Sequence, residues 1–279
     1  MMNKCMGIVL VALLLSGCSI KLAYNNLDRF VRWQVADFVD LDKEQRALLD
    51  QEVKKVWQWH RRSHLPLYAD YLETFADQAS DEVTPALLEN LFDQFFDWGM
   101  QVQERSMPTA IAIMRSLSDE QVAGLPDKLA ESNDELLEPE AEGELADFQE
   151  RWADEVVDGL EQFAGRLQKS QKDYVALQSR RYQPERALWV EYRVRWQAAL
   201  MQQLQQRDSE AFGEQFTKLV RERESYYSPE FVQVSAANQA LGVDVASYVL
   251  SNLTPRQSER FRDRLLELSE DFRELSQRS

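Results

Sequence analysis

The stretch LADFQERWADEVVDGLEQFAGRLQKSQKDYVAL, residues 145–177, decides the fold class of this chain. Its large apolar residues recur every three or four positions, which places them along one face of a helix. They are Phe148, Trp152, Val156, Leu160, Phe163, Leu167, Tyr174 and Leu177. The pattern predicts one long amphipathic α-helix, although Gly159 and Gly165 weaken its continuity.

Similar periodicity recurs along the rest of the chain, and no stretch shows the strict polar–apolar alternation of a half-buried strand. We expect further helices at 25–37, 43–63, 67–79, 85–105, 188–204, 209–226 and 255–277. Only 9 Gly and 8 Pro occur among 279 residues, which argues against turn-rich β-sandwiches and barrels. The predicted fold class is therefore all-α, with residues 25–279 forming an irregular multi-helix bundle of long amphipathic helices.

Helix starts are marked by cap residues. Proline follows Ser or Thr at residues 84–85, 228–229 and 254–255, which is the favoured order for a cap and the first helical position. Three segments, Leu41–Gln45, Leu117–Gln121 and Leu253–Gln257, also place Gln three positions after a cap residue, as a capping box does. The pattern L-T-x-x-Q also resembles the motif of small periplasmic helical chaperones, which leaves chaperone kinship as an alternative to simple capping.

The first twenty residues have the layout of an export signal. Lys4 precedes an apolar run from Gly7 to Leu15 that is too short to span a bilayer as a mature helix. The four residues Leu15-Ser16-Gly17-Cys18 resemble the bacterial lipobox, which implies cleavage before Cys18 and lipidation of its sulfur by palmitate-type acyl chains. We therefore expect residues 1–17 to be a lipoprotein signal peptide and residues 18–24 to be a lipidated tether.

Lipidation would leave no free cysteine, because Cys5 is removed with the signal peptide. Disulfides, zinc–thiolate sites and a cysteine nucleophile are then excluded. Several acyl chains on Cys18 would hold the body stably at a membrane. Ser19, rather than Asp, follows the cysteine, and in bacterial lipoproteins this implies sorting to the periplasmic face of the outer membrane. No later stretch is apolar for long enough to cross a bilayer.

Charge is distributed unevenly in this acidic chain, whose formal net charge is −16. Residues 119–162 hold sixteen acidic and two basic residues, whereas residues 165–195 hold eight basic and three acidic ones. The acidic segment and the basic segment either pair within the chain or leave a basic surface for an anionic partner. Residues 179–196 also interleave arginine with aromatic residues, but export and net acidity favour arginine stems covering the core over nucleic-acid binding.

His60 and His64 are the only histidines, and their spacing places both rings on one face of a helix. They are the candidate metal ligands, but zinc normally takes at least three protein ligands, so a carboxylate would have to complete the site. The alternative is a helix end at which His and Arg meet the last carbonyl groups. We expect no cofactor.

Enzyme motifs such as GxSxG, GxGxxG and the P-loop are absent. A Glu-Ser pair, as in lytic transglycosylases, occurs at Glu131-Ser132 and Glu224-Ser225, but without a glycine-rich substrate-binding context. An enzyme acting on peptidoglycan therefore stays a minor hypothesis.

The segments Tyr24–Arg29, Val39–Leu41 and Trp59–Arg62, with Trp33, Asp37 and Gln45, resemble a family of proteobacterial lipoproteins designated only as a domain of unknown function. The resemblance implies a helical, membrane-anchored periplasmic protein and transfers no site residues. We expect a non-enzymatic outer-membrane lipoprotein that serves as an envelope interaction or maintenance module, with an envelope protein as a possible partner and no nucleic acid. The alternative is a periplasmic holdase, and metal binding is a further hypothesis.

Overall fold

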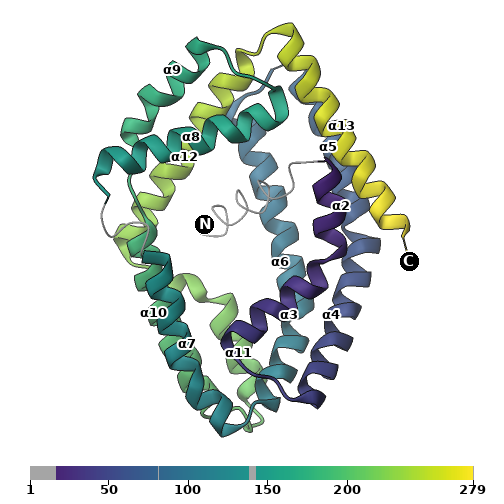
Figure 1. Cartoon of the computed structure of the whole chain (residues 1–279), viewed down its shortest axis with the longest axis vertical. Coiled ribbons are helices and arrows are strands. Elements are labelled where there is room, and N and C mark those ends of the chain that lie inside the picture. Colours follow the sequence, from purple (N-terminus) through teal and green to yellow (C-terminus); the bar gives the residue numbers. More distant parts are fainter. Residues whose placement is uncertain (1–16, 81, 138–142, 279) are drawn as a thin grey trace.

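The computed structural model describes residues 17–80, 82–137 and 143–278, and these residues contain helices and no β-strand. The predicted all-α class is confirmed for this part of the chain. Figure 1 shows the helices following one another round an elongated oval. The α-helices are α2 (Gly17–Asn25), α3 (Leu27–Phe38), α4 (Lys43–Ser63), α5 (Leu65–Ala79), α6 (Pro85–Ser116), α7 (Asp119–Leu137), α8 (Leu145–Ala164), α9 (Lys169–Gln178), α10 (Arg186–Leu204), α11 (Phe212–Arg221), α12 (Pro229–Ser251) and α13 (Pro255–Gln277), with 3₁₀ turns η2 (Ser179–Arg181) and η3 (Arg223–Tyr226).

The single long helix predicted over residues 145–177 is wrong, because the chain breaks at Gly165 between α8 and α9. Gly165 has φ 74°, a left-handed conformation that glycine adopts without strain. A Cβ atom at this position would lie 2.8 Å from Cδ of Arg260, so the neighbouring helix α13 also favours glycine here. Gly159, in contrast, stays inside α8.

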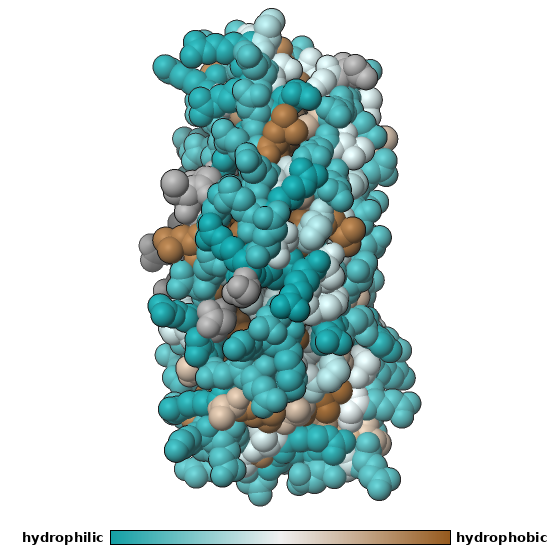
Figure 2. Space-filling view, turned by 90° about the vertical axis from the view of Figure 1, so that its right-hand side faces the viewer, coloured by the Kyte–Doolittle hydropathy of each residue, from teal (hydrophilic) through white to brown (hydrophobic). Residues whose placement is uncertain are grey.

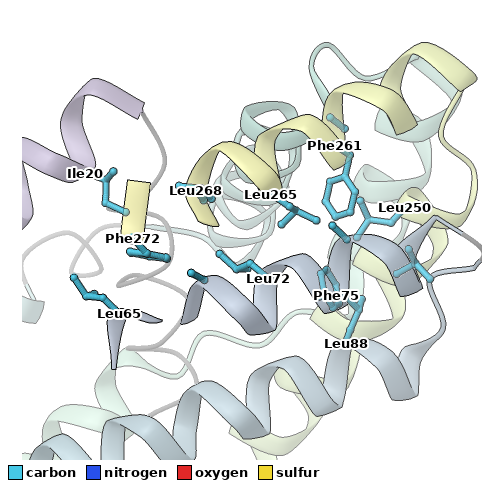
Figure 3. Close-up of a cluster of buried hydrophobic side chains, with 14 of the residues drawn as sticks. Ile20, Leu65, Leu72, Phe75, Leu88, Leu250, Phe261, Leu265, Leu268 and Phe272 are labelled. Atoms are coloured by element: carbon cyan, nitrogen blue, oxygen red, sulfur yellow. The ribbon is translucent and has the colours of Figure 1, made fainter. Parts of the chain in front are cut away.

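Among the described residues, the apolar core is divided into four clusters of buried side chains instead of one central core. The largest joins α2, α5, α6, α8, α12 and α13, and Figure 3 shows Phe75, Leu72 and Leu265 among its members. A second cluster lies among α4, α6, α7, α10 and α11, with Phe212 fully buried. The predicted bundle is therefore a succession of local helix packings round the oval of Figure 1.

All three predicted capping boxes are present, and two of them face each other. Gln45 accepts a hydrogen bond from the backbone N–H of Asp42, and Gln121 accepts one from Ser118, so each caps its own helix. Their side-chain amides then bond each other, with N···O distances of 2.9 and 2.7 Å. Each amide also donates across the contact to a carbonyl just before the opposite motif, those of Ser116 (2.6 Å) and Asp40 (2.6 Å). We call this arrangement the first glutamine clasp.

The same arrangement occurs again between α9 and α13. Gln257 caps α13 through Thr254, and Gln171 caps α9 through the backbone N–H of Gln168. The two amides again bond each other, at 3.1 and 3.4 Å, and each reaches a carbonyl before the opposite helix. This second glutamine clasp uses a fourth motif, Leu167–Gln171, which the sequence does not mark clearly because Gln168 is not a typical cap residue.

Candidate functional site

Helix α2 joins the expected lipidation site directly to the body. Ile20 is fully buried and Tyr24 is 8% exposed, and Figure 3 places Ile20 beside Phe272 and Leu65. Between them, Lys21 forms salt bridges of 2.7 Å with both Asp271 and Glu274 of α13. These two carboxylates raise the pKa of Lys21, which keeps the ammonium group charged. Helix α2 is thus fixed by apolar and ionic contacts at once.

Residues 18–24, expected to form a tether, instead belong to a helix that packs on the body. The physical reason is the spacing of Ile20 and Tyr24, which are four residues apart and so lie on the same helix face. Cys18 lies within this helix, two residues before Ile20. A lipid on Cys18 would consequently be held close to the folded body, without a linker between them.

His60 connects three helices through its two ring nitrogens. Its Nδ1 lies 2.9 Å from the Tyr24 hydroxyl of α2, and its Nε2 lies 3.0 Å from the Tyr68 hydroxyl of α5. A neutral imidazole has one N–H donor and one acceptor nitrogen, so one tyrosine accepts a hydrogen bond and the other donates one. Trp57 stacks on Tyr24, with ring centroids 4.0 Å apart. Neither partner follows from the periodic pattern round His60, because Tyr24 is 36 residues away and Tyr68, eight residues away, belongs to the next helix.

Burial is the main cause of the altered proton affinities in this cluster. It lowers the pKa of His60 to about 4, with a smaller contribution from the nearby His64. It also lowers the pKa of His64, against an opposing hydrogen bond with Gln101, and it raises the pKa of Tyr24 and Tyr68. Both histidines are therefore neutral near pH 7, and His60 acts as an uncharged connector between helices.

The two candidate metal ligands, His60 and His64, lie together with stacked rings whose centroids are 5.3 Å apart. Across the residues that the structure describes, no group of three or more His, Cys, Asp and Glu side chains could hold a metal ion. Metal binding would also have to displace a tyrosine hydroxyl from His60. Metal binding by this pair stays a prediction.

The acidic and basic segments do fold onto each other. Helix α7 packs against α10, and α8 packs against α9. In the first pair the link is a buried amide contact, because Asn133 donates to Gln197 at 2.7 Å and accepts from Arg193 at 2.9 Å. In the second pair Lys172 forms a 2.6 Å salt bridge with Glu161. Neutral hydrogen bonds and packing thus contribute to the contact alongside charge.

The arginines interleaved with aromatic residues also make bonds within the chain. Arg195 donates to the backbone carbonyl of Tyr226 at 2.9 Å, and Arg181 lies 3.6 Å from Asp244. The aromatic residues nearby pack on one another, with Trp189, Tyr192 and Phe231 in one cluster. These contacts agree with the interpretation that the arginines cover the edge of the core.

The two Glu-Ser pairs lie at the surface, with Glu131 and Glu224 both exposed. Glu131 forms a salt bridge of 2.9 Å with Lys128. Hydrogen bonds from basic side chains lower the pKa of four other carboxyl groups, those of Glu73, Glu104, Glu161 and Glu274. A general acid in glycoside hydrolysis needs the opposite shift.

A surface groove of about 790 Å³ lies beside the second glutamine clasp, between the end of α8 and α13. Arginine and carboxylate side chains line it together. They are Arg166, Arg256, Arg260, Arg264, Glu259, Asp263 and Glu267. Because both signs of charge are present, the groove has no clear preference for an anion or a cation.

The side of the molecule formed by α4 and α13 is mainly polar. Figure 2 shows the side of the molecule that α13 and α4 occupy in Figure 1, where hydrophilic residues surround small, separate hydrophobic areas. Among the described helices, none combines the length and the apolar character needed to cross a membrane.

Comparison with known proteins identifies a family and little else. A search of the curated proteins and a search of the solved structures each found no match. Residues 37–232, more than half of the chain, match a family of unknown function (DUF6279). The match includes Val39–Leu41 and Trp59–Arg62, on which the resemblance to an uncharacterised family was based, but not Tyr24 or Trp33. The chain therefore belongs to the family of unknown function DUF6279.

Proposed function

We propose that this protein is a non-enzymatic lipoprotein of the bacterial envelope. Acyl chains on Cys18 anchor it at the periplasmic face of the outer membrane, and its helical body serves as an interaction or maintenance module. The observation that carries the proposal is the position of the lipobox-like sequence. Leu15–Cys18 ends where α2 packs into the body, and Ile20 is buried only two residues after the cysteine. Cleavage before Cys18 would therefore leave the contacts of Ile20 and Tyr24 with the body intact.

The ionisable residues support a non-catalytic role. His60 is enclosed by two tyrosines, and the carboxyl groups with clearly shifted pKa values have arginine or lysine partners that keep them ionised. Catalytic acids and bases instead have pKa values tuned towards the working pH. The buried glutamines of the two clasps likewise serve the fold, because their amides are occupied by caps and by each other.

Cys18→Ser tests the anchor. We expect the wild-type chain to carry palmitate and to fractionate with outer membranes, because the thioether-linked diacylglyceryl group requires the cysteine sulfur. The serine variant should lose the label completely and keep residues 1–17. Intact mass spectrometry and labelling with an alkyne palmitate analogue measure both effects. Cys5→Ser is the matched control and should be processed normally. A wild-type chain with an unmodified Cys18 would contradict the proposal.

A holdase is the second candidate, favoured by the L-x-x-x-Q pattern of the four capping motifs, of which Leu253–Gln257 has the full L-T-x-x-Q form. If this function holds, the purified full-length protein should suppress the aggregation of a reduced, unfolded client at an equimolar ratio. Light scattering with and without the protein measures this, with serum albumin as the control. Unchanged scattering would exclude the holdase and leave the anchored interaction module as the proposal.

A further inference from the structure

Exposed apolar side chains are concentrated directly after Cys18. Across the described residues ten large hydrophobic side chains are exposed, and four of them fall between residues 22 and 33. These are Leu22 (67%), Leu27 (38%), Phe30 (49%) and Trp33 (59%). Single exposed hydrophobic residues are common on protein surfaces, but a group of four at one end of the sequence indicates a surface with a specific use.

Helices α2 and α3 have apolar residues on two opposite faces. The inner face packs on the body through Ile20 and Tyr24 of α2 and through Val35 of α3. Phe30 and Trp33 are three residues apart and share one face of α3, away from Val35. Leu22 is exposed on α2, two residues from both Ile20 and Tyr24, so it points away from the contact that they make. The rings of Phe30 and Trp33 lie against each other, with centroids 5.9 Å apart. We call Leu22, Phe30 and Trp33 the outer face.

The chemistry of the outer face matches a membrane–water interface. Leucine, phenylalanine and tryptophan are the residues that interfacial helices bury among lipid headgroups, and arginine is typical of their borders. Arg29 and Arg32 are both exposed on α3, and Arg32 lies 3.3 Å from Asp50 of α4. Helix α4, which packs against α3, has six basic and three acidic residues in a chain whose net charge is −16. Basic side chains of α3 and α4 thus lie beside this surface and would attract anionic headgroups, whereas α7, which also packs against α3, is acidic.

We propose that the outer face of α2 and α3 lies in the headgroup region of the bilayer that holds the lipidated Cys18. This inference rests on the proposed lipid anchor. Leu22 is four residues, about one helical turn, after Cys18. Because α2 is packed on the body and leaves no linker, acyl chains at Cys18 bring the outer face to the membrane surface. The body then has one fixed orientation towards the periplasm instead of moving freely on a tether.

Quenching of Trp33 fluorescence tests the proposal. The full-length lipidated chain is purified in detergent and reconstituted into phosphatidylethanolamine–phosphatidylglycerol vesicles with or without brominated acyl chains. An interfacial face reaches about 5–10 Å into the lipid, so we expect the bromines to remove about half of the Trp33 emission. That emission is the difference between the wild type and Trp33→Phe, since the chain has 7 Trp.

Two variants supply the comparison. Phe30→Asp places a charge on the outer face and should reduce the quenching of Trp33 at least twofold. Val194→Asp is the matched control, because Val194 is 50% exposed on α10, far along the chain from the anchor, and should leave the quenching unchanged.

The outcomes separate this inference from the proposed anchor. If the chain is lipidated and floats with the vesicles but bromine leaves Trp33 emission unchanged, the outer face does not touch lipid, and only this inference fails. The same holds if Trp33 is shielded in a concentration-dependent way without lipid, because a second protein chain then covers it. If the chain carries no lipid and does not float, the proposed function itself fails.

Discussion

Replacing Gln257 by leucine is expected to lower the free energy of unfolding by about 3 kcal/mol, since several buried polar groups lose their partner at once. Gln257 is 7% exposed and bonds the backbone of Thr254, the carbonyl of Arg166 and the amide of Gln171. Leucine has a similar volume, so the loss reports on hydrogen bonds more than on a cavity. Urea unfolding followed by circular dichroism at 222 nm measures the change.

Two further variants show whether the second glutamine clasp acts as a unit. Gln202→Leu is the control, because Gln202 is exposed on α10, and it should change stability by less than about 0.5 kcal/mol. Each single variant leaves the amide of the other glutamine without this partner. The double variant Gln171→Leu/Gln257→Leu removes both amides, so neither is left unpaired. Its loss should therefore be smaller than the sum of the two single losses. Simple additivity would mean that the two glutamines cap their helices independently.

Stability is expected to fall by about 2 kcal/mol between pH 7 and pH 5 because of His60 alone. The folded protein keeps this ring neutral until the pH reaches about 4, whereas the ordinary pKa of histidine is 6.5. Between these values the unfolded chain binds more protons, so acid favours unfolding. His64, whose pKa is also lowered, acts in the same direction. The carboxyl groups with lowered pKa values titrate below this window and contribute little to it.

His60→Gln isolates this effect, because glutamine retains a donor and an acceptor for Tyr24 and Tyr68 but has no proton to gain. Its urea midpoint should depend less on pH between 7 and 5 than that of the wild type. His64→Gln is the companion variant, and it should retain the contribution of His60. An equally steep pH dependence in wild type and His60→Gln would show that His60 is not kept neutral by the fold.

Much of the fold could be predicted because its signals are local. The 3.6-residue periodicity gave the helical class, and Thr84, Ser228 and Thr254 mark helix starts that the structure retains. The bounds of α12 do not follow from the periodic pattern, because its buried residues lie round most of its circumference and leave a weak periodic signal. Gly165 weakens the predicted helix of residues 145–177, but its left-handed backbone, which ends α8, is seen only in the structure.

The contacts of the candidate site could not be predicted, because they join distant parts of the chain. Gln45 and Gln121 each show a capping pattern, yet nothing near either one indicates that their amides meet across 76 residues. The same is true of His60, whose tyrosine partners come from α2 and α5. The pair His60 and His64 was noticed for its spacing, whereas burial determines its chemistry.

The attachment of α2 has a consequence for the order of assembly. Helix α2 packs largely on α13. Lys21 bonds Glu274, which is 253 positions further along the chain, and Ile20 belongs to the buried cluster that contains Phe272. In a polypeptide that leaves the cytoplasm amino end first, as export would require, α2 cannot make these contacts until α13 has followed. Contacts between residues so far apart in the chain are slow to form. In the export and lipidation proposed above, residues 17–25 would therefore stay undocked, and open to the enzymes that act at Cys18, until α13 has formed.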